Sequence, residues 1–161
     1  MNGSTGLVSV ADNNLLDLGN GPLSLEAWIK LSATGTPDYI IGKSTGAYGL
    51  RVSGTGTALV FSRVGQATLA TSTGTMDTTH YHYVVVTYAG ANGPVTFYID
   101  GINAGVSSPA SNLVDNTLSL GIGSGGGSGP TAPFHGTIDE AAVYNIALTS
   151  TQVAAHYAAG K

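Results

Sequence analysis

The chain has 161 residues, of which only 9% are charged and 24 are glycine, and its formal net charge is −4. Its five Lys and Arg residues are spread singly, which excludes the basic patch that nucleic acids and anionic lipids require. It has no cysteine, which excludes disulfides and thiolate metal sites, and no apolar run of about eighteen residues, which excludes a helical membrane span.

This length suits one domain that covers residues 1–161 and buries its own core. A surface made of Ser, Thr, Asn and Gly is typical of β proteins that are extracellular or lie on a cell or virion surface, so we expect that location. The N-terminus lacks the basic and then apolar pattern of a secretory signal. A removed signal, excision from a larger protein and export by assembly all stay open.

Alternating apolar and polar residues predict short strands through the first half of the chain. The expected strands cover residues 5–10, 23–31, 39–43, 48–52, 58–62 and 67–71. Residues 39–52 and 58–71 each predict a hairpin. In residues 23–31, Leu, Ala and Ile alternate with Ser, Glu, Trp and Lys, and we interpret Trp28 as a core anchor rather than a ligand platform.

The second half predicts further strands and a final helix. Strands are expected at residues 82–88, 95–99, 117–122 and 134–145, and residues 82–88 are apolar on both faces, as in a buried central strand. Residues 103–106 should lead into a polar loop. Residues 123–130 predict a flexible glycine-rich surface loop, without the Lys of a phosphate-binding loop. A capping box at residues 149–152 predicts a helix that ends before Gly160.

These segments, in this order, resemble the laminin G-like, concanavalin A-like lectin and glucanase family. The resemblance is carried by residues 16–18, 25–29, 82–88, 97–101, 120–123, 134–140, 143–145 and 147–148. It implies an all-β fold: a two-sheet antiparallel jelly-roll sandwich of about a dozen strands, here with one short C-terminal helix. It also implies a non-catalytic binding or adhesion module, because many relatives bind glycans and many hold a calcium ion near the sheet edge.

Calcium is the cofactor that this resemblance implies, and it needs several oxygen ligands that include a carboxylate. Asp139 is the first candidate, because the matching motif position is often at or near that ion. Alternatively, Asp139 only accepts hydrogen bonds from backbone donors. Asp12, Asn13 and Asp17 would join it if the first and last strands pair. For Asp12 and Asp17 the alternative is a loop cap through an Asx turn.

Asp139 and Glu140 are neighbours in an expected strand, so their side chains should point to opposite faces. A glycoside hydrolase needs two carboxylates around one bond, so the chain is not expected to be an enzyme. Glu26 and Glu140 are expected as buried structural partners. His80 and His82 could contact a metal, but two ligands do not make a site, and strand packing or edge solvation is the alternative.

A carbohydrate site needs an exposed aromatic ring under the apolar face of a sugar and planar polar groups for the hydroxyls. The candidates at loops and strand ends are Tyr39, Tyr48, Tyr81, Tyr88 and Asn92. Tyr81 stands where the family usually has Trp. The alternative interpretation is that these tyrosines bridge core and surface, with each hydroxyl reaching water or a partner.

We therefore expect a binding or adhesion module that recognises carbohydrate, with a glycan or another protein surface as its partner. The alternative is a structural surface protein, such as a virion decoration or filament subunit, that self-assembles through the same jelly roll. A glycoside hydrolase ranks third, because the required carboxylate pair is missing from the expected strand geometry.

Overall fold

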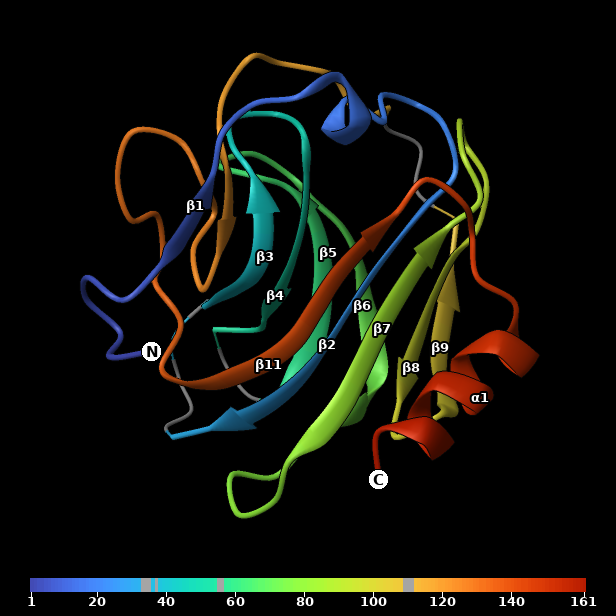
Figure 1. Cartoon of the computed structure of the whole chain (residues 1–161). Coiled ribbons are helices and arrows are strands. Elements are labelled where there is room, and N and C mark those ends of the chain that lie inside the picture. The colour runs from blue at the N-terminus through green and yellow to red at the C-terminus, as the bar shows by residue number, and fades with distance from the viewer. Residues whose placement is uncertain (33–35, 37, 55–56, 109–111) are drawn as a thin grey trace.

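A computed structural model of the chain shows two antiparallel sheets packed face to face, with one helix against the outside of one sheet (Figure 1). The structure describes residues 1–32, 36, 38–54, 57–108 and 112–161. These residues form eleven strands and one α-helix. The all-β, two-sheet jelly-roll sandwich with one short C-terminal helix is therefore confirmed.

The larger sheet contains the first strand of the chain, and the smaller sheet contains the last strand. The six-stranded sheet has the order β1 (Val8–Val10), β10 (Leu120–Ile122), β3 (Tyr39–Lys43), β4 (Tyr48–Val52), β5 (Ala58–Arg63), β6 (Thr68–Thr75). The five-stranded sheet has the order β11 (Gly136–Tyr144), β2 (Leu23–Leu31), β7 (His82–Tyr88), β8 (Val95–Ile99), β9 (Ile102–Ser107). Both predicted hairpins are present, as β3–β4 and β5–β6.

Strand β9 corrects the expectation that residues 103–106 lead into a polar loop. Residues 102–107 pair with β8, and the register shifts by one position between Phe97 and Tyr98. Gly105 adopts φ +133° at this irregularity, a conformation that favours glycine. The glycine therefore allows the strand to form where the sequence pattern suggests a loop.

The main core lies between the sheets, and β2 shows how the sequence builds it. The buried core cluster takes every second residue of β2, namely Leu23, Leu25, Ala27, Ile29 and Leu31. The alternate positions Glu26 and Trp28 face outward. Strand β7 lies between β2 and β8, so the prediction of a buried central strand is confirmed.

Helix α1 (Ser150–Ala159) covers part of the outer face of the five-stranded sheet (Figure 1). The capping box is present: Thr149 Oγ1 accepts the N–H of Gln152 at 3.3 Å, and Gln152 Oε1 accepts the N–H of Thr149 at 2.9 Å. Val153 is buried against a second apolar cluster that includes Tyr83 and Val85 of β7. This cover explains why β7 is apolar on both faces. In the part of the chain that the structure describes, no helix is long and apolar enough to cross a membrane.

The glycine-rich segment differs from the flexible surface loop that the sequence suggests. Residues 123–126 are buried, and only residues 128–130 of this segment are exposed. A Cβ on Gly42 of β3 would lie 2.8 Å from the Cα of Gly125, and a Cβ on Gly125 would lie 2.9 Å from Val64 Cγ1. The segment therefore packs onto the six-stranded sheet, and its glycines permit this close backbone contact.

Candidate functional site

A cavity of about 310 Å³ opens on the outer face of the five-stranded sheet. It is lined by Trp28, Tyr81, Asp139, Glu140 and Gly160, and we call it the outer-face pocket. These residues come from β2, the residues just before β7, strand β11 and the end of α1. The sandwich therefore brings four separate segments of the chain to one concave place.

A β-bulge in β11 brings both carboxylates to this pocket. Asp139 pairs with Trp28, but the next pair is Ala142 with Glu26, so β11 contains one extra residue. Glu140 lies in this bulge with φ +47°, and its N–H donates to Asp139 Oδ1 at 2.9 Å. The prediction that Asp139 and Glu140 point to opposite faces is wrong, because the bulge interrupts the alternation. Glu140 is also exposed rather than buried.

The indole ring of Trp28 forms a fixed wall of the pocket. Its centroid lies 5.7 Å from the centroid of the Tyr157 ring, and the two ring planes are 25° apart. The centroid of the Tyr83 ring lies 5.5 Å away. Gly160 approaches the indole ring so closely that a Cβ there would lie 2.5 Å from Nε1. Trp28 therefore packs with the second apolar cluster, as an anchor, and also lines the pocket, which the sequence interpretation did not include.

Tyr81 supplies the exposed ring of the pocket, with 49% of its surface accessible. Its loop is held by Asp77, whose carboxylate accepts the N–H of Thr79 at 2.6 Å and the N–H of His80 at 2.9 Å. His80 Nδ1 also lies 2.9 Å from Asp77 Oδ2. The side-chain hydrogen bond from His80, followed by those from Thr79, holds the pKa of Asp77 well below its usual range. These hydrogen bonds hold the loop that carries Tyr81 in one conformation.

The neighbouring His82 is used by the fold. Its Nδ1 lies 2.8 Å from Asp100 Oδ2, and its Nε2 accepts the N–H of Asp77 at 3.2 Å. His80 pairs with Asp77, so both histidines serve as structural partners, in line with the alternative to a metal role. Within the described residues, no group of three or more His, Cys, Asp or Glu could hold a metal ion.

Glu26 anchors helix α1 to the sheet through a buried polar cluster. Its carboxylate accepts the hydroxyls of Tyr83 at 2.5 Å and Tyr144 at 2.7 Å, and His156 Nδ1 lies 3.0 Å away. Burial, and then the hydrogen bond to Glu26, raises the pKa of Tyr144 to about 12. The same causes raise the pKa of Tyr83 further. The expectation that Glu26 is a buried structural partner is confirmed.

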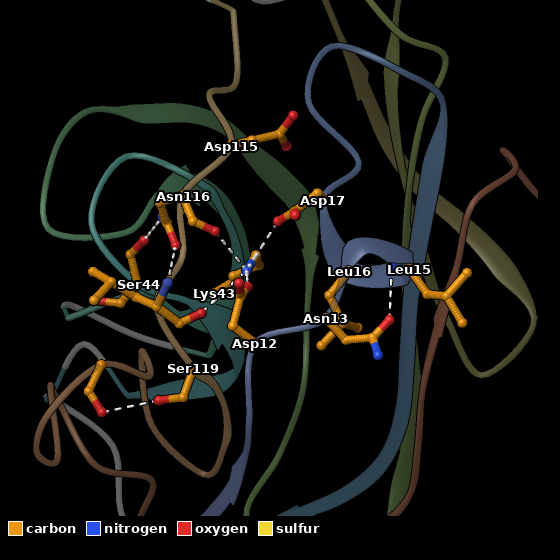
Figure 2. A network of polar contacts seen from close by, with 12 residues as sticks. Asp12, Asn13, Leu15, Leu16, Asp17, Lys43, Ser44, Asp115, Asn116 and Ser119 are labelled. Carbon is orange, nitrogen blue, oxygen red and sulfur yellow. Dashed lines mark hydrogen bonds and ion pairs between the residues drawn. The ribbon is translucent and has the colours of Figure 1, made fainter.

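Three of the predicted calcium ligands lie in the loop after β1. The ammonium Nζ of Lys43 is 2.5 Å from Asp12 Oδ1 and 3.2 Å from Asp17 Oδ1 (Figure 2). Asn13 Oδ1 instead accepts the N–H of Leu15 at 2.9 Å, which caps the short 3-10 helix η1 (Asn14–Leu16). Asp12 and Asp17 are therefore partners of a buried lysine.

The fourth predicted ligand, Asp139, lies on a different sheet. The predicted grouping depended on pairing between the first and last strands, but β1 pairs with β10 and β11 pairs with β2. Asp139 therefore faces the outer-face pocket, while Asp12 and Asp17 hold Lys43 at the six-stranded sheet. These residues do not fit one calcium site, and calcium binding itself stays a prediction.

Of the five predicted carbohydrate contacts, the structure brings one to the pocket. Tyr39, Tyr48 and Tyr88 are buried, so the prediction that these rings are exposed is wrong. Two of these rings use their hydroxyls inside the fold: Tyr48 donates to the carbonyl of Leu16 at 3.0 Å, and the hydroxyl of Tyr39 lies 3.1 Å from Ser62 Oγ. Asn92 is exposed with φ +58° in the turn after β7, at the opposite end of that strand from Tyr81.

Sequence reasoning missed Glu140 and Gly160 as pocket residues. The bulge that places Glu140 lacks the glycine that would have marked it, since Glu140 itself holds the left-handed conformation. In the sequence, the glycine at position 160 indicates only the end of a helix. A glycine at a helix end is equally suited to a close approach by another side chain.

Comparison with known proteins places the chain among lectin-like folds. A family model described as the concanavalin A-like lectin/glucanases superfamily matches residues 2–154. Domain 4 of AbnA, a GH43 extracellular arabinanase from Geobacillus stearothermophilus solved with arabinotriose, is 21% identical. Its TM-score is 0.68, and the match covers 96% of this chain and 73% of that one.

Two further solved structures share the fold at lower identity. The CBM40 of the Ruminococcus gnavus IT-sialidase, bound to α2,3-sialyllactose, is 10% identical with a TM-score of 0.69, covering 96% of this chain and all 100% of that one. The binding domain of Paraclostridial Mosquitocidal Protein 1 is 12% identical with a TM-score of 0.71, covering 96% of this chain. The present chain spans only 41% of that structure's length. A comparison with curated proteins finds no match.

Proposed function

Because this chain belongs to the concanavalin A-like lectin/glucanase superfamily, we propose that it is a non-catalytic module that binds carbohydrate in the outer-face pocket. The observation that carries this proposal is the combination of a half-exposed tyrosine ring with two carboxylates around one cavity. The ring of Tyr81 would stack on the apolar face of a sugar. Asp139 and Glu140 would accept hydrogen bonds from its hydroxyls.

The size of the pocket favours a short ligand. Its volume of about 310 Å³ is at the small end of the usual range for small-molecule sites, roughly 300–1,000 Å³. We therefore expect recognition of a terminal sugar or a short glycan end. The ordered loop at Asp77 and the stacked Trp28 reduce the entropy that binding would otherwise cost.

The charge of the pocket favours neutral sugars and amino sugars over acidic ones. In the described part of the chain, neither Asp139 nor Glu140 forms an ion pair. Lys30 Nζ lies 6.0 Å from the centroid of the Tyr81 ring, but an anionic sugar that contacts Asp139 and Glu140 would bring a third negative charge beside these two and would be repelled by them. We therefore expect this chain to prefer arabinotriose-like neutral glycans to sialylated ones.

The arrangement of the carboxylates supports binding rather than hydrolysis. A glycosidase places its acid and its nucleophile or base on either side of the scissile bond. Asp139 and Glu140 are consecutive residues of β11 and both line the pocket from that one strand, so we do not expect them to flank a glycosidic bond. We expect no release of reducing sugar from oligosaccharides that the chain binds.

The experiment uses the single tryptophan of the chain as a reporter. Trp28 lines the pocket, so a bound glycan should change its fluorescence. An array of neutral, amino and acidic glycans, screened with calcium and again after chelation, identifies the ligand class. Arabinotriose and α2,3-sialyllactose then serve as soluble neutral and acidic probes in fluorescence titrations.

Variants of the pocket test the site. Tyr81→Ala should weaken binding at least about tenfold, equivalent to about 1.4 kcal/mol, and Asp139→Asn should weaken it to a similar degree. Leu15→Ala removes an exposed apolar side chain from η1, away from the pocket, and should leave binding unchanged. A blank array in both conditions, or binding unaffected by Tyr81→Ala and Asp139→Asn, would rule out the proposal.

A second candidate function is a self-assembling surface protein, favoured by one observation on strand β9. This strand forms an edge of the five-stranded sheet, and its Ile102 and Val106 are 73% and 62% exposed. The backbone of β9 lies against β6, where Thr73 Oγ1 donates to the carbonyl of Ala104 at 3.1 Å, so a second copy would pack on the exposed side chains of Ile102 and Val106. Sedimentation over a range of concentrations should then show assemblies that Val106→Lys dissolves, whereas a monomer throughout rejects this function.

Location follows from these proposals. A glycan-binding module or a surface protein would act outside the cell or on a cell or virion surface, as the low-charge surface also suggests. The arabinanase whose domain 4 shares this fold is described as extracellular.

A further inference from the structure

Lys43 is a fully buried lysine whose ammonium group is surrounded by oxygen atoms. Its side chain has 0% exposure. Nζ donates to Asp12 Oδ1 and to the carbonyl of Asn116 at 2.9 Å (Figure 2). It also donates to the carbonyl of Leu118 at 3.1 Å, and Asp17 Oδ1 lies 3.2 Å away as an ion-pair partner. A lysine is almost never fully buried unless it is paired, because an unpaired charge is costly to remove from water. Here three oxygens accept the three N–H groups of the ammonium, and the fourth, Asp17 Oδ1, lies within ion-pair distance without a hydrogen bond from the described residues.

These oxygens come from two loops that flank neighbouring strands of the six-stranded sheet, since β1 pairs with β10 and β10 pairs with β3. Asp12 and Asp17 belong to the segment between β1 and β2, whereas Asn116 and Leu118 lie just before β10. Lys43 is the last residue of β3. The ammonium is therefore the point at which two loops are fastened to the end of the six-stranded sheet.

Neighbouring contacts strengthen the same junction. The side chain of Asn116 donates to the carbonyl of Ser44 and accepts the N–H of Leu118 at 2.9 Å. The carboxylate of Asp115 accepts the N–H of Gly19 at 2.6 Å, which ties the two loops to each other. The junction thus concentrates carboxylate and carbonyl oxygens around one central positive charge.

The four oxygens around Lys43 Nζ are of the kind that bind a hard cation: two belong to carboxylates and two to backbone carbonyls. We propose that the ammonium of Lys43 is a built-in replacement for a bound divalent cation at this end of the sandwich. The chain then needs no metal to hold the two loops here. Removal of the ammonium should leave an oxygen cradle that takes up an external cation.

The test compares thermal unfolding of the wild-type chain and Lys43→Ala in chelator, in millimolar calcium and in n-propylammonium. Wild-type Tm should be the same in all three. Lys43→Ala should lower Tm by about 10 °C in chelator, since breaking a buried ion pair leaves uncompensated charge. Calcium should raise the variant's Tm in proportion to the logarithm of its concentration, as for a ligand that binds only the folded state. Propylammonium, which restores the deleted group, should also raise it.

Lys30→Ala provides the matched control, because Lys30 is a partly exposed lysine on the outer face of β2. Its Tm should not depend on either cation. Two outcomes would overturn the proposal: a wild-type Tm that falls on chelation, or a Lys43→Ala Tm that calcium does not raise, whether or not propylammonium raises it.

Asp12→Asn keeps the test decisive if Lys43→Ala does not fold. This variant retains the lysine and an oxygen acceptor and removes one negative charge beside the ammonium. Its Tm should fall by several degrees, about 2–4 °C for each kcal/mol lost. The Tm should remain independent of calcium, because the ammonium still occupies the cradle. An unchanged Tm, or one that calcium raises, would contradict the role given to Lys43.

Discussion

The backbone of Gly160 lies directly against the indole ring of Trp28. A Cβ added to Gly160 would lie 2.5 Å from Nε1, 2.9 Å from Cε2 and 3.0 Å from Cζ2 of that ring. The ring is held from other sides by Tyr83 and Tyr157, so it has little freedom to move away. The end of helix α1 and the wall of the outer-face pocket are therefore one packed unit.

Gly160→Ala should disturb the pocket more than the fold. The added methyl group must displace either the last residues of the chain or the indole ring. We expect glycan affinity to fall about fivefold, or about 1 kcal/mol, and the fluorescence of Trp28 to shift without ligand. Ala158→Ser, an exposed change on the same helix, is the control. An unshifted emission spectrum in Gly160→Ala would show that the helix end moves aside freely.

The fold was predictable because its main signals are local. The alternation in residues 23–31 gives both the bounds and the inward face of β2, and the capping box at Thr149 gives the start of α1. The pairing of β1 with β10 and of β11 with β2 was not predictable in this way. Pairing depends on contacts between residues more than a hundred positions apart, and no local pattern records them.

The site was less predictable, for reasons that particular residues show. Tyr81 was a candidate and lines the pocket, but Tyr39, Tyr48 and Tyr88 have the same composition signal and are buried. Asp139 and Glu140 share the pocket only because of a bulge, which depends on how β11 pairs with β2. The burial of Lys43 also has no sequence signature, since its partners come from two distant loops.

Asp77→Ala should weaken glycan binding without removing a pocket residue. Asp77 accepts hydrogen bonds from Thr79 and His80, which order the loop that carries Tyr81. Without these hydrogen bonds the loop becomes ordered only when the glycan binds, and the entropy lost in that step weakens binding. We therefore expect glycan affinity to fall about threefold, which is less than in Tyr81→Ala. Fluorescence titration measures the glycan affinity of both variants. A loss equal to that of Tyr81→Ala would mean that Asp77 does more than order the loop.

The stabilising effect of Asp77 should have a defined pH range. The folded pKa of Asp77 lies below its ordinary value of 3.8, mainly through the hydrogen bond from His80. The stabilisation is therefore complete above the unfolded pKa and is lost as pH falls through the folded pKa. The difference in Tm between wild type and Asp77→Ala should be fully present at about pH 4–5 and shrink as the pH falls below about 4. A difference that disappears by pH 5 would reject this assignment.

Tyr144→Phe should lower stability at neutral pH. The Tyr144 hydroxyl donates to the carboxylate of Glu26 at 2.7 Å, and a hydrogen bond to a charged group is worth about 1.5–3 kcal/mol. We expect a fall in Tm of about 6 °C. Tyr81→Phe, which alters a half-exposed hydroxyl at the pocket, should change Tm by less than about 2 °C.

The same pair of variants predicts an alkaline effect. The pKa of Tyr144 rises from 10.0 to about 12 in the folded chain, first through burial and then through Glu26. Stabilisation by a raised pKa is complete below the unfolded value and is lost as pH rises through the folded value. The difference in Tm between wild type and Tyr144→Phe should therefore shrink between pH 10 and about 12. The Tyr81→Phe difference should show no such change in that window.

Gly42→Ala should destabilise the chain through backbone contact alone. Its Cβ would lie 2.8 Å from the Cα of Gly125 and 3.2 Å from both the carbonyl carbon and the oxygen of that residue, so no flexible side chain can move aside. We expect a loss of about 1–3 kcal/mol in the free energy of unfolding, as for other overpacked positions. Gly129→Ala is the matched control in the same glycine-rich segment, because nothing lies within 4 Å of its added Cβ. That control should be neutral or gain about 0.4–1 kcal/mol through the unfolded state. Urea unfolding measures both variants, and equal stability for the two would show that residues 123–126 do not pack on β3 as described.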